Sequence, residues 1–290
     1  MPENNARGLD HLVIGVADLD AAGAFYADLG FRVGARNRHP WGTENPIVQF
    51  PGAFLELITV GDSTLIPPHA PRHFSFGAFV RDALARAEGM SMLVLESRDS
   101  KGDAEGFRSA GIGDFEPFFF ERQARRPDGS EVRVAFSLAF ADNRAAPECG
   151  FFVCQQLEPQ NFWNPAFQQH QNGASGLSAV FLVAQEPAAQ TAFLKAFSGA
   201  ESFATPEAGL RLPLPRGRLE VLTPEAAAAR LNDESGQEQA RFAGFAIAVP
   251  DLEPLRSLLA ERGIAHGGDG ARIVVPAQAA FGCAIVFEMG

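Results

Sequence analysis

The stretch GLDHLVIGVADLDAAGAFYADLG, from Gly8 to Gly30, combines a strand pattern with a helix pattern. Its first part, LDHLVIGVAD, mixes β-branched and other apolar residues as strands do, and Asp18 is suited to cap the start of a helix. In LDAAGAFYADLG the apolar residues recur at helical spacing until Gly30, which ends the helix. Three more strand patterns follow, at residues 31–36, 45–50 and 53–60. The sequence therefore predicts the order strand, helix, strand, strand, strand.

This unit recurs along the chain, and the recurrence is the most informative feature of the sequence. Residues 176–197 overlay residues 8–29 without a gap, and GRLEVLTP at 217–224 resembles GAFLELITV at 52–60 in placing a glutamate between apolar residues. A further copy begins at residue 242, and a more diverged copy fits residues 91–158. The chain is therefore predicted to contain four βαβββ units.

One segment interrupts the series and is predicted to connect two halves. PQNFWNPAFQQHQNGASG, at 159–176, is rich in Pro, Asn, Gly and aromatic residues, as connections between domains often are. We expect one domain at 8–158, a connection at 159–175 and a second domain at 176–290. A helix is also expected within residues 75–89, inserted between the first two units.

Charge and composition favour a small-molecule ligand as the partner. The chain has 290 residues, 46% of them apolar, and 24 basic against 35 acidic residues give a formal net charge of −11. Nucleic acids and anionic membranes bind clustered Lys and Arg, so neither partner is expected. The basic cluster from Arg122 to Arg126 runs into the turn sequence PDG and is interpreted as the solvated end of a hairpin.

Several features indicate a cytoplasmic protein. The apolar stretches have the length of strands and fall short of the roughly 20 residues that a membrane helix needs. The N-terminal residues MPENNARGLD contain no apolar signal core, and three cysteines cannot all pair. We expect a monomer or a homodimer.

Repeated units that open with LDHLVIGVADLDAAGAFYADLGF and close with GAFLELI resemble the vicinal oxygen chelate superfamily, which includes glyoxalase I, extradiol dioxygenases and bleomycin-resistance proteins. The runs HPWGTENPIVQF and RRPDG are similar to those of its glyoxalase-like domain proteins. The resemblance implies an α+β fold in which the four βαβββ modules pair into two cupped mixed-sheet domains. It also implies a divalent metal ion in the cup, held by side chains from the first and last strands of the units.

His11 matches the first-strand ligand position of this family, and Glu56 matches the last-strand position. Side chains alternate across a sheet, so His11 shares a face with Val13, and Glu56 shares a face with Phe54 and Ile58. If the two strands are neighbours, an imidazole and a carboxylate meet inside an apolar cup. A buried carboxylate is tolerated mainly beside a cation or a strong hydrogen-bond partner. The alternatives are a core histidine or a simple ion pair between the two residues.

The other ligand positions of the resemblance are only partly filled. In the second unit the closing strand offers Gln155 or Gln156, while Met92 falls near the first position. The third and fourth units keep the acidic positions as Glu220 and Glu288 but have Ala179 and Gly244 in place of histidine, so we expect them to serve mainly as scaffold. Oxygen ligands suit Mg²⁺ or Mn²⁺, and Ni²⁺ and Zn²⁺ stay open. No second histidine falls on an expected ligand strand, which argues against an extradiol dioxygenase; the histidines considered are His39, His69, His73, His170 and His266.

The resemblance implies a metal-dependent lyase or isomerase that acts on a small substrate with two adjacent oxygens. Glu56 is then a metal ligand or the catalytic base. Trp41, Thr43 and Asn45 are expected to rim the substrate pocket, and Phe152 to line it. The alternative is a non-catalytic protein that sequesters a small molecule, as bleomycin-resistance proteins do.

Overall fold

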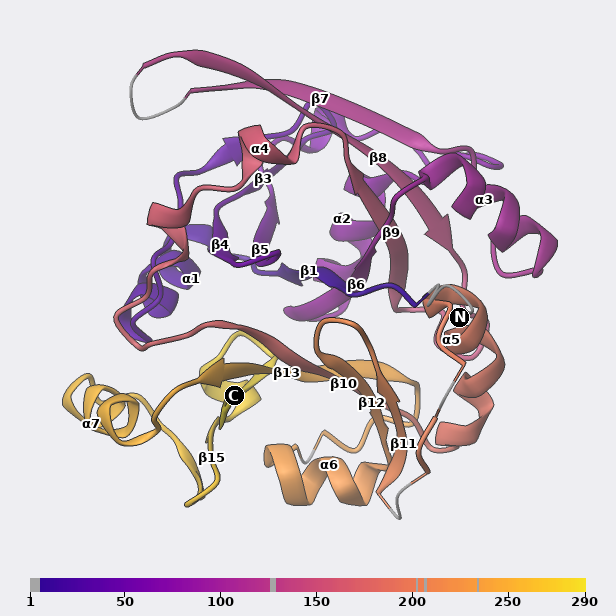
Figure 1. Cartoon of the computed structure of the whole chain (residues 1–290). Coiled ribbons are helices and arrows are strands. Elements are labelled where there is room, and N and C mark those ends of the chain that lie inside the picture. The colour runs from indigo at the N-terminus through magenta and orange to yellow at the C-terminus, as the bar shows by residue number, and fades with distance from the viewer. Residues whose placement is uncertain (1–5, 126–128, 202, 206–207, 234) are drawn as a thin grey trace.

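The computed structural model describes residues 6–125, 129–201, 203–205, 208–233 and 235–290. Figure 1 shows two layers, one built from the N-terminal half of the chain and one from the C-terminal half. Across the described residues the strands form two mixed sheets, one in each layer.

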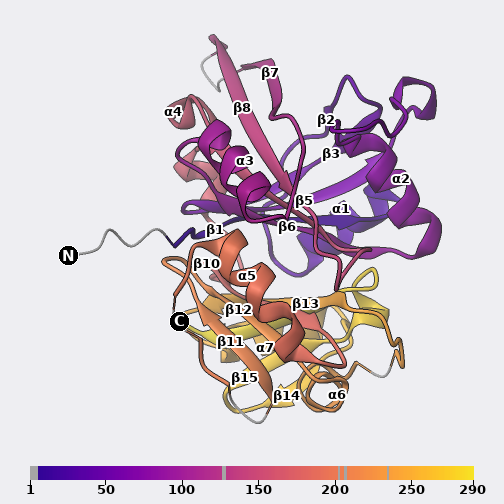
Figure 2. The same cartoon turned by 90° about the vertical axis from the view of Figure 1, so that its right-hand side faces the viewer.

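The first sheet has the strand order β2-β3-β5-β1-β6-β9-β8-β7, and β4 pairs with β5 beside this path. Its strands are β1 (Leu9–Gly15), β2 (Asn37–Arg38), β3 (Thr43–Asn45), β4 (Ile47–Phe50), β5 (Ala53–Val60), β6 (Gly89–Glu96), β7 (Phe118–Arg125), β8 (Glu131–Ala141) and β9 (Gly150–Gln156). Helices α1 (Leu19–Asp28), α2 (Phe76–Arg86) and α3 (Ser100–Ser109) belong to the same half. The β7–β8 hairpin rises beyond the rest of this layer (Figure 2).

The second sheet has the order β11-β12-β10-β13-β16-β15-β14. Its strands are β10 (Gly176–Val183), β11 (Gly209–Pro213), β12 (Arg218–Leu222), β13 (Arg241–Val249), β14 (Gly267–Asp269), β15 (Arg272–Val275) and β16 (Ala284–Met289). The remaining α-helices are α4 (Pro159–Phe162), α5 (Thr191–Ser198), α6 (Pro224–Leu231) and α7 (Glu253–Glu261).

The same pairing scheme occurs in both sheets. In the first, β1 is parallel to β5 and antiparallel to β6, and β6 is parallel to β9. In the second, β10 is parallel to β12 and antiparallel to β13, and β13 is parallel to β16. Each pair of βαβββ units therefore joins through its opening strands, which confirms the fold that the repeat predicted.

The largest apolar core lies between the two layers. The sheet faces that carry Leu12 and Leu55 in one half and Val180 and Phe245 in the other contribute to one continuous buried cluster. Because side chains alternate along a strand, every second residue points away from this central core. These residues form a separate apolar cluster on the outer, cupped face of each sheet. In the second sheet this face is lined mainly by small residues and is packed by Ala227 and Leu231 of α6.

The segment between the halves runs from α4 past α1 to β10 (Figure 1). The imidazole of His170 fastens it to the first half, because Nδ1 accepts a hydrogen bond from Arg32 N at 3.0 Å and Nε2 lies 2.9 Å from Gln49 O. Asn172 Nδ2 donates to Leu29 O at 2.9 Å, next to the end of α1. The helix expected at 75–89 is present as α2.

Two strand predictions differ from the structure. Residues 31–36 form no strand. A backbone hydrogen bond from Gly34 N to Ile47 O, at 2.8 Å, holds this segment beside β4, but the regular hydrogen-bond pattern of a strand pair does not form. The strand expected at 45–50 is divided at Pro46 into β3 and β4, because proline has no N–H to donate to a ladder. Within the described ranges, every helix is too short or too polar to cross a membrane.

Candidate functional site

A β-bulge at Asp10 shapes the first part of the site. In the pairing of β1 with β6, Leu9 lies opposite Leu95 and His11 opposite Val94, so Asp10 is the extra residue. The bulge interrupts the alternation and brings the Asp10 and His11 side chains together. His11 Nδ1 donates to Asp10 Oδ1 at 2.5 Å, and both residues are buried. This bond directs the other ring nitrogen, Nε2, away from Asp10 and toward Glu56.

Glu56 lies on β5, the parallel neighbour of β1, and its carboxylate faces His11. The register pairs His11 with Phe54 and Val13 with Glu56. Glu56 Oε2 is 3.9 Å from His11 Nε2, and Asn45 Nδ2 donates a hydrogen bond to Oε1. The predicted convergence of His11 and Glu56 on one face is thus present, and Asn45 holds the carboxylate from β3.

A second histidine, His39, follows β2 directly and lies on the wall of the same cavity. Its ring stacks on Trp41 with centroids 4.6 Å apart, and its Nδ1 lies 2.8 Å from Thr43 Oγ1. Burial lowers the pKa of His39, and Arg122 lowers it further against the opposing effect of Glu56. His39 is therefore a neutral imidazole at pH 7. Sequence reasoning left it out because it falls on no expected ligand strand.

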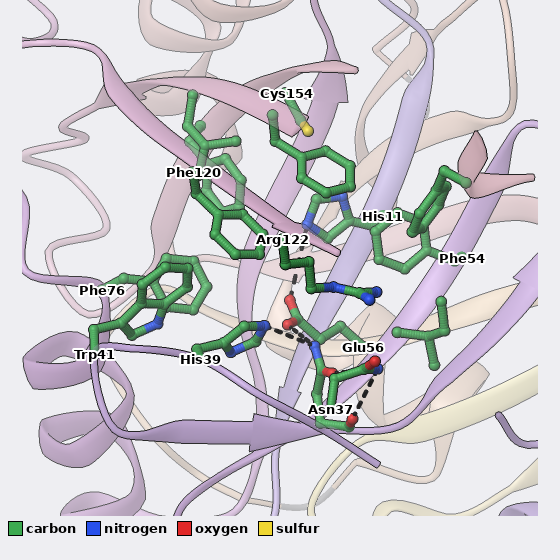
Figure 3. Close-up of a pocket in the computed structure, with 16 residues that line it drawn as sticks. His11, Asn37, His39, Trp41, Phe54, Glu56, Phe76, Phe120, Arg122 and Cys154 are labelled. Atoms are coloured by element: carbon green, nitrogen blue, oxygen red, sulfur yellow. Dashed lines mark hydrogen bonds and ion pairs between the residues drawn. The ribbon is translucent and has the colours of Figure 1, made fainter. Parts of the chain in front are cut away.

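Aromatic side chains enclose these polar groups in a cavity of about 80 Å³. Phe54 stacks on His11 with centroids 4.2 Å apart, and Phe152 meets the same ring edge-on at 5.4 Å. The cavity is also lined by Trp41, Asn45, Phe76, Phe120, Phe136 and Phe162. Figure 3 shows these side chains around His11, His39 and Glu56.

The expected pocket residues are thus mostly in place, with one exception. Trp41, Asn45 and Phe152 line the cavity. Thr43 is fully buried behind His39 and does not line it, so its expected place at the rim is wrong. Its hydroxyl orients His39 instead.

The two glutamines on β9 point to opposite faces of the sheet. Gln156 follows Phe152 and Cys154 by alternation, and its Nε2 donates to Asp10 Oδ2 at 3.0 Å. Gln155 turns the other way, where its Oε1 accepts from Ser100 N at 3.1 Å at the start of α3. Gln155 is therefore wrong as a metal ligand. Gln156 keeps a buried Oε1 without a hydrogen-bond partner in the described part of the chain.

Arg122 on β7 points into the same cavity from the opposite wall (Figure 3). It pairs with Val134 across the β7–β8 hairpin and shares its face with Phe118 and Phe120. Burial lowers the pKa of Arg122. The interpretation of this residue as part of a solvated hairpin end is therefore wrong; Arg126, Pro127 and Asp128 of that cluster and turn lie outside the described residues.

A family model described as a glyoxalase-like domain matches residues 9–197, more than half of the chain. The chain belongs to the glyoxalase-like domain family. The resemblance to the vicinal oxygen chelate superfamily is thereby confirmed. Among curated proteins, no sequence gives a significant match.

Two solved structures share the glyoxalase-like architecture over nearly the whole chain. A hypothetical protein from Staphylococcus aureus is 13% identical, with 98% of this chain and 99% of that chain covered and a TM-score of 0.70. A mutant of 4-hydroxymandelate synthase from Streptomyces coelicolor is 12% identical, with 98% and 93% covered and a TM-score of 0.58. At these identities the likeness shows the fold alone.

The first glyoxalase-like cup has donors that fit a divalent cation. Metal bonds to imidazole nitrogen and carboxylate oxygen are each about 2.1 Å long, so one ion can bridge the 3.9 Å between His11 Nε2 and Glu56 Oε2. Asp10 behind His11 is the carboxylate partner that metal-binding histidines commonly have. Gln156, which contacts Asp10 behind His11, has an Oε1 without a partner among the described residues and is a further potential oxygen donor.

Asp10, His11 and Cys154 also bring three ligand atoms within 4.8 Å of one another. Both Asp10 oxygens are already hydrogen-bonded, one to His11 and one to Gln156. Burial, reinforced by Asp10 and Glu56, raises the pKa of the Cys154 thiol well above its usual value. A cation between Asp10 and Cys154 would have to remove this buried thiol proton, so the gap between His11 and Glu56 is the better cation site.

The corresponding carboxylates of the second cup are engaged in ion pairs. Arg218 and Arg230 each lie 2.7 Å from a Glu220 oxygen, and Arg218 also pairs with Glu288 at 2.7 Å. Burial acts to raise the pKa of Glu220, but the hydrogen bonds from Arg230 and Arg218 outweigh it and lower the pKa to about 2. Both glutamates are therefore neutralised by arginines of the chain itself.

Proposed function

We propose that this protein is a divalent-metal-dependent lyase or isomerase that acts on a small substrate with two adjacent oxygens. The observation that carries the proposal is the pair His11 Nε2 and Glu56 Oε2, which face each other across 3.9 Å at the bottom of an aromatic cavity. His11, Glu56 and Gln156 are the proposed metal ligands, and Mg²⁺, Mn²⁺, Ni²⁺ and Zn²⁺ are the ions to test. The family membership supports this choice of chemistry.

Each residue around the pair has a distinct part in the proposed reaction. A bound cation would withdraw electron density from a substrate oxygen and so acidify a neighbouring C–H group. Asp10 accepts the hydrogen bond from His11 Nδ1, which would orient Nε2 toward a bound cation. Asn45 fixes Glu56 by its hydrogen bond to Oε1, which leaves Oε2 as ligand or proton acceptor. His39, neutral and on the cavity wall, is a second group that can accept the proton.

The experiment is a measurement of metal content. Purified wild-type protein, His11→Ala, Glu56→Gln and the control His69→Ala are loaded with each of the four ions, desalted and analysed for bound metal. His69 is exposed and pairs with Asp82 away from the cavity, so its loss leaves the site intact. We expect about one ion per chain in the wild type and the control, and a loss in the other two variants. Equal metal content in all four proteins would refute the site.

Proton transfer is tested separately, by NMR in D₂O with small 2-hydroxycarbonyl compounds. The metal-loaded wild type is expected to exchange the proton next to the carbonyl, and Glu56→Gln to exchange it at least about tenfold more slowly, as expected when a general base is lost. Exchange that continues unchanged after removal of the ion would contradict the proposed role of the metal.

A non-catalytic binding protein is the second candidate. It is favoured by β6, whose cup-facing side chains Met92 and Val94 are apolar, so this strand supplies no ligand where His11 stands on β1. The aromatic walls alone can hold an apolar molecule. In that case the wild type retains no stoichiometric metal, and it binds an apolar ligand equally well with and without added metal ions.

We further propose that residues 8–158 and 176–290 act as two domains joined by 159–175, and that the protein works in the cytoplasm. The buried, unpaired Cys149, Cys154 and Cys283 support a reducing compartment. Limited proteolysis that cuts first within 159–175 would support the boundaries, and preferential cutting inside either sheet would contradict them.

A further inference from the structure

Arg122 is half-buried in the wall of the cavity and has no anionic partner there. Among the described residues, no carboxylate lies within ion-pair distance of its guanidinium. Arg133 on the adjacent strand β8 differs, because it pairs with Glu121 and Glu158, each at 2.6 Å. Two arginines on one hairpin therefore have opposite environments: Arg133 is exposed and paired, whereas Arg122 is turned inward and unpaired.

The carboxylate that lines the cavity with Arg122, and the one behind His11, are engaged with other groups. Glu56 accepts a hydrogen bond from Asn45 and faces His11, and Asp10 is bonded to His11 and Gln156. Burial lowers the pKa of Arg122, and no carboxylate offsets this effect. A guanidinium removed from water without a partner is energetically unfavourable, and a planar carboxylate is the group that its donor geometry fits best.

The surroundings of Arg122 indicate where the rest of such a ligand lies. Arg122, Phe162, Asn37 and Ile47 line both the inner cavity and an outer groove of about 770 Å³. The cavity beside His11 and Glu56, at about 80 Å³, is much smaller than the groove. The groove is walled by apolar side chains of β8 and of the connecting segment, among them Val132, Val134 and Trp163.

We propose that the ligand is a carboxylic acid with an apolar or aromatic body: its carboxylate binds Arg122 at the junction of cavity and groove, and its body lies in the groove. This inference rests on the proposed function in that it names the substrate class of the same cavity. The polar atoms that react would then reach inward, toward His11 and Glu56.

The test compares an acid with its uncharged isostere. Binding of 4-phenylbutanoate and of 4-phenylbutanamide is measured by calorimetry for wild-type protein, Arg122→Gln, Arg122→Lys and the control Arg133→Gln. We expect the wild type and Arg133→Gln to prefer the acid by about tenfold or more, as a charge-assisted pair allows. Arg122→Gln should lose this preference, and Arg122→Lys, which keeps the charge without the planar fork, should retain part of it.

Two outcomes would overturn the inference: a wild type without preference for the acid, or an Arg122→Gln protein that prefers the acid as strongly as the wild type. Each measurement is made on metal-free and on metal-loaded protein. An Arg122-dependent preference in a protein that takes up no metal would refute the proposed metal chemistry and support the acid site. Normal metal content without the preference would refute the acid site alone. Arg122→Lys retains the apolar stem and the charge, so it still tests the acid site if Arg122→Gln does not fold.

Discussion

Replacing Asp10 by asparagine is the sharpest test of how the site is built. The substitution keeps the size of the side chain but removes its charge, and it leaves both candidate ligands, His11 and Glu56, in place. The Asp10 carboxylate accepts two hydrogen bonds, from His11 Nδ1 at 2.5 Å and from Gln156 Nε2 at 3.0 Å. An asparagine has one acceptor oxygen, so its amide group must face one of these two donors.

The size of the effect follows from these contacts. A hydrogen bond to a charged acceptor contributes about 1.5–3 kcal/mol and a neutral one about 1 kcal/mol, so the hydrogen bond that orients His11 is weakened by about 0.5–2 kcal/mol. This range corresponds to a loss in metal affinity of about 2- to 30-fold, and substitutions of such outer-shell carboxylates generally cost about 10- to 100-fold. We therefore expect Asp10→Asn to bind a divalent ion about tenfold more weakly than the wild type.

The assay is a competition titration with a chromophoric chelator and Zn²⁺ or Ni²⁺ at pH 7. Asp18→Ala is the matched control, because it removes the N-cap of α1, whose side chain accepts from Asp20 N and Ala21 N, and lowers stability by about 1 kcal/mol without touching the cavity. His11→Ala gives the limit of complete ligand loss. Wild-type affinity in Asp10→Asn, together with lost binding in His11→Ala, would refute the role assigned to Asp10.

Three further outcomes are expected. Gln156→Ala should weaken metal binding by several-fold while Gln155→Ala leaves it unchanged, because only the first side chain faces Asp10; equal effects in the same titration would contradict this assignment. Glu220→Gln should lower the free energy of urea unfolding by about 2–4 kcal/mol at pH 7, since it breaks a buried ion-pair network. The pKa of Glu220 is about 2 in the folded protein and about 4.3 in the unfolded chain. The difference in unfolding free energy between wild type and Glu220→Gln should therefore be complete above about pH 5 and shrink as the pH falls toward 2. A difference that does not change with pH would refute this dependence on Glu220 ionisation. Gly30→Ala should destabilise the fold by about 1–3 kcal/mol in thermal melts, because φ is +87° and a Cβ would lie 2.8 Å from a Leu258 carbon. The control Gly23→Ala, in the open middle of α1, should be neutral or stabilising in the same measurement.

The strands and their faces could be predicted from sequence because both follow from local periodicity. The repeat located the opening strands, and alternation placed His11 and Glu56 on cup-facing positions of β1 and β5. Alternation from Phe152 would also have separated Gln156 from Gln155. What local pattern could not supply was the bulge at Asp10, since strict alternation puts this residue on the face opposite His11.

The other missed residues depend on how the sheet curls. His39 lies outside the strands, and its place on the cavity wall is set by stacking on Trp41 and by Thr43. Arg122 is seven residues before Gly129 of the PDG turn, where a solvated position is the reasonable expectation. It reaches the cavity only because β7 stands at the edge of a sheet that curves around the cup (Figure 1).

The two cups differ in how the chain itself neutralises their buried charges. Both halves keep a glutamate on the strand beside the opening strand, Glu56 on β5 and Glu220 on β12. In the second half, α6 packs onto the small residues of the cup and brings Arg230 to Glu220, so the carboxylate is neutralised by the chain itself. In the first half the facing group is a neutral-capable imidazole, and the nearby arginine stays unpaired. The buried Glu56 carboxylate and the half-buried Arg122 guanidinium are not paired with each other, and this is the feature from which the proposed cation site and the proposed acid site both follow.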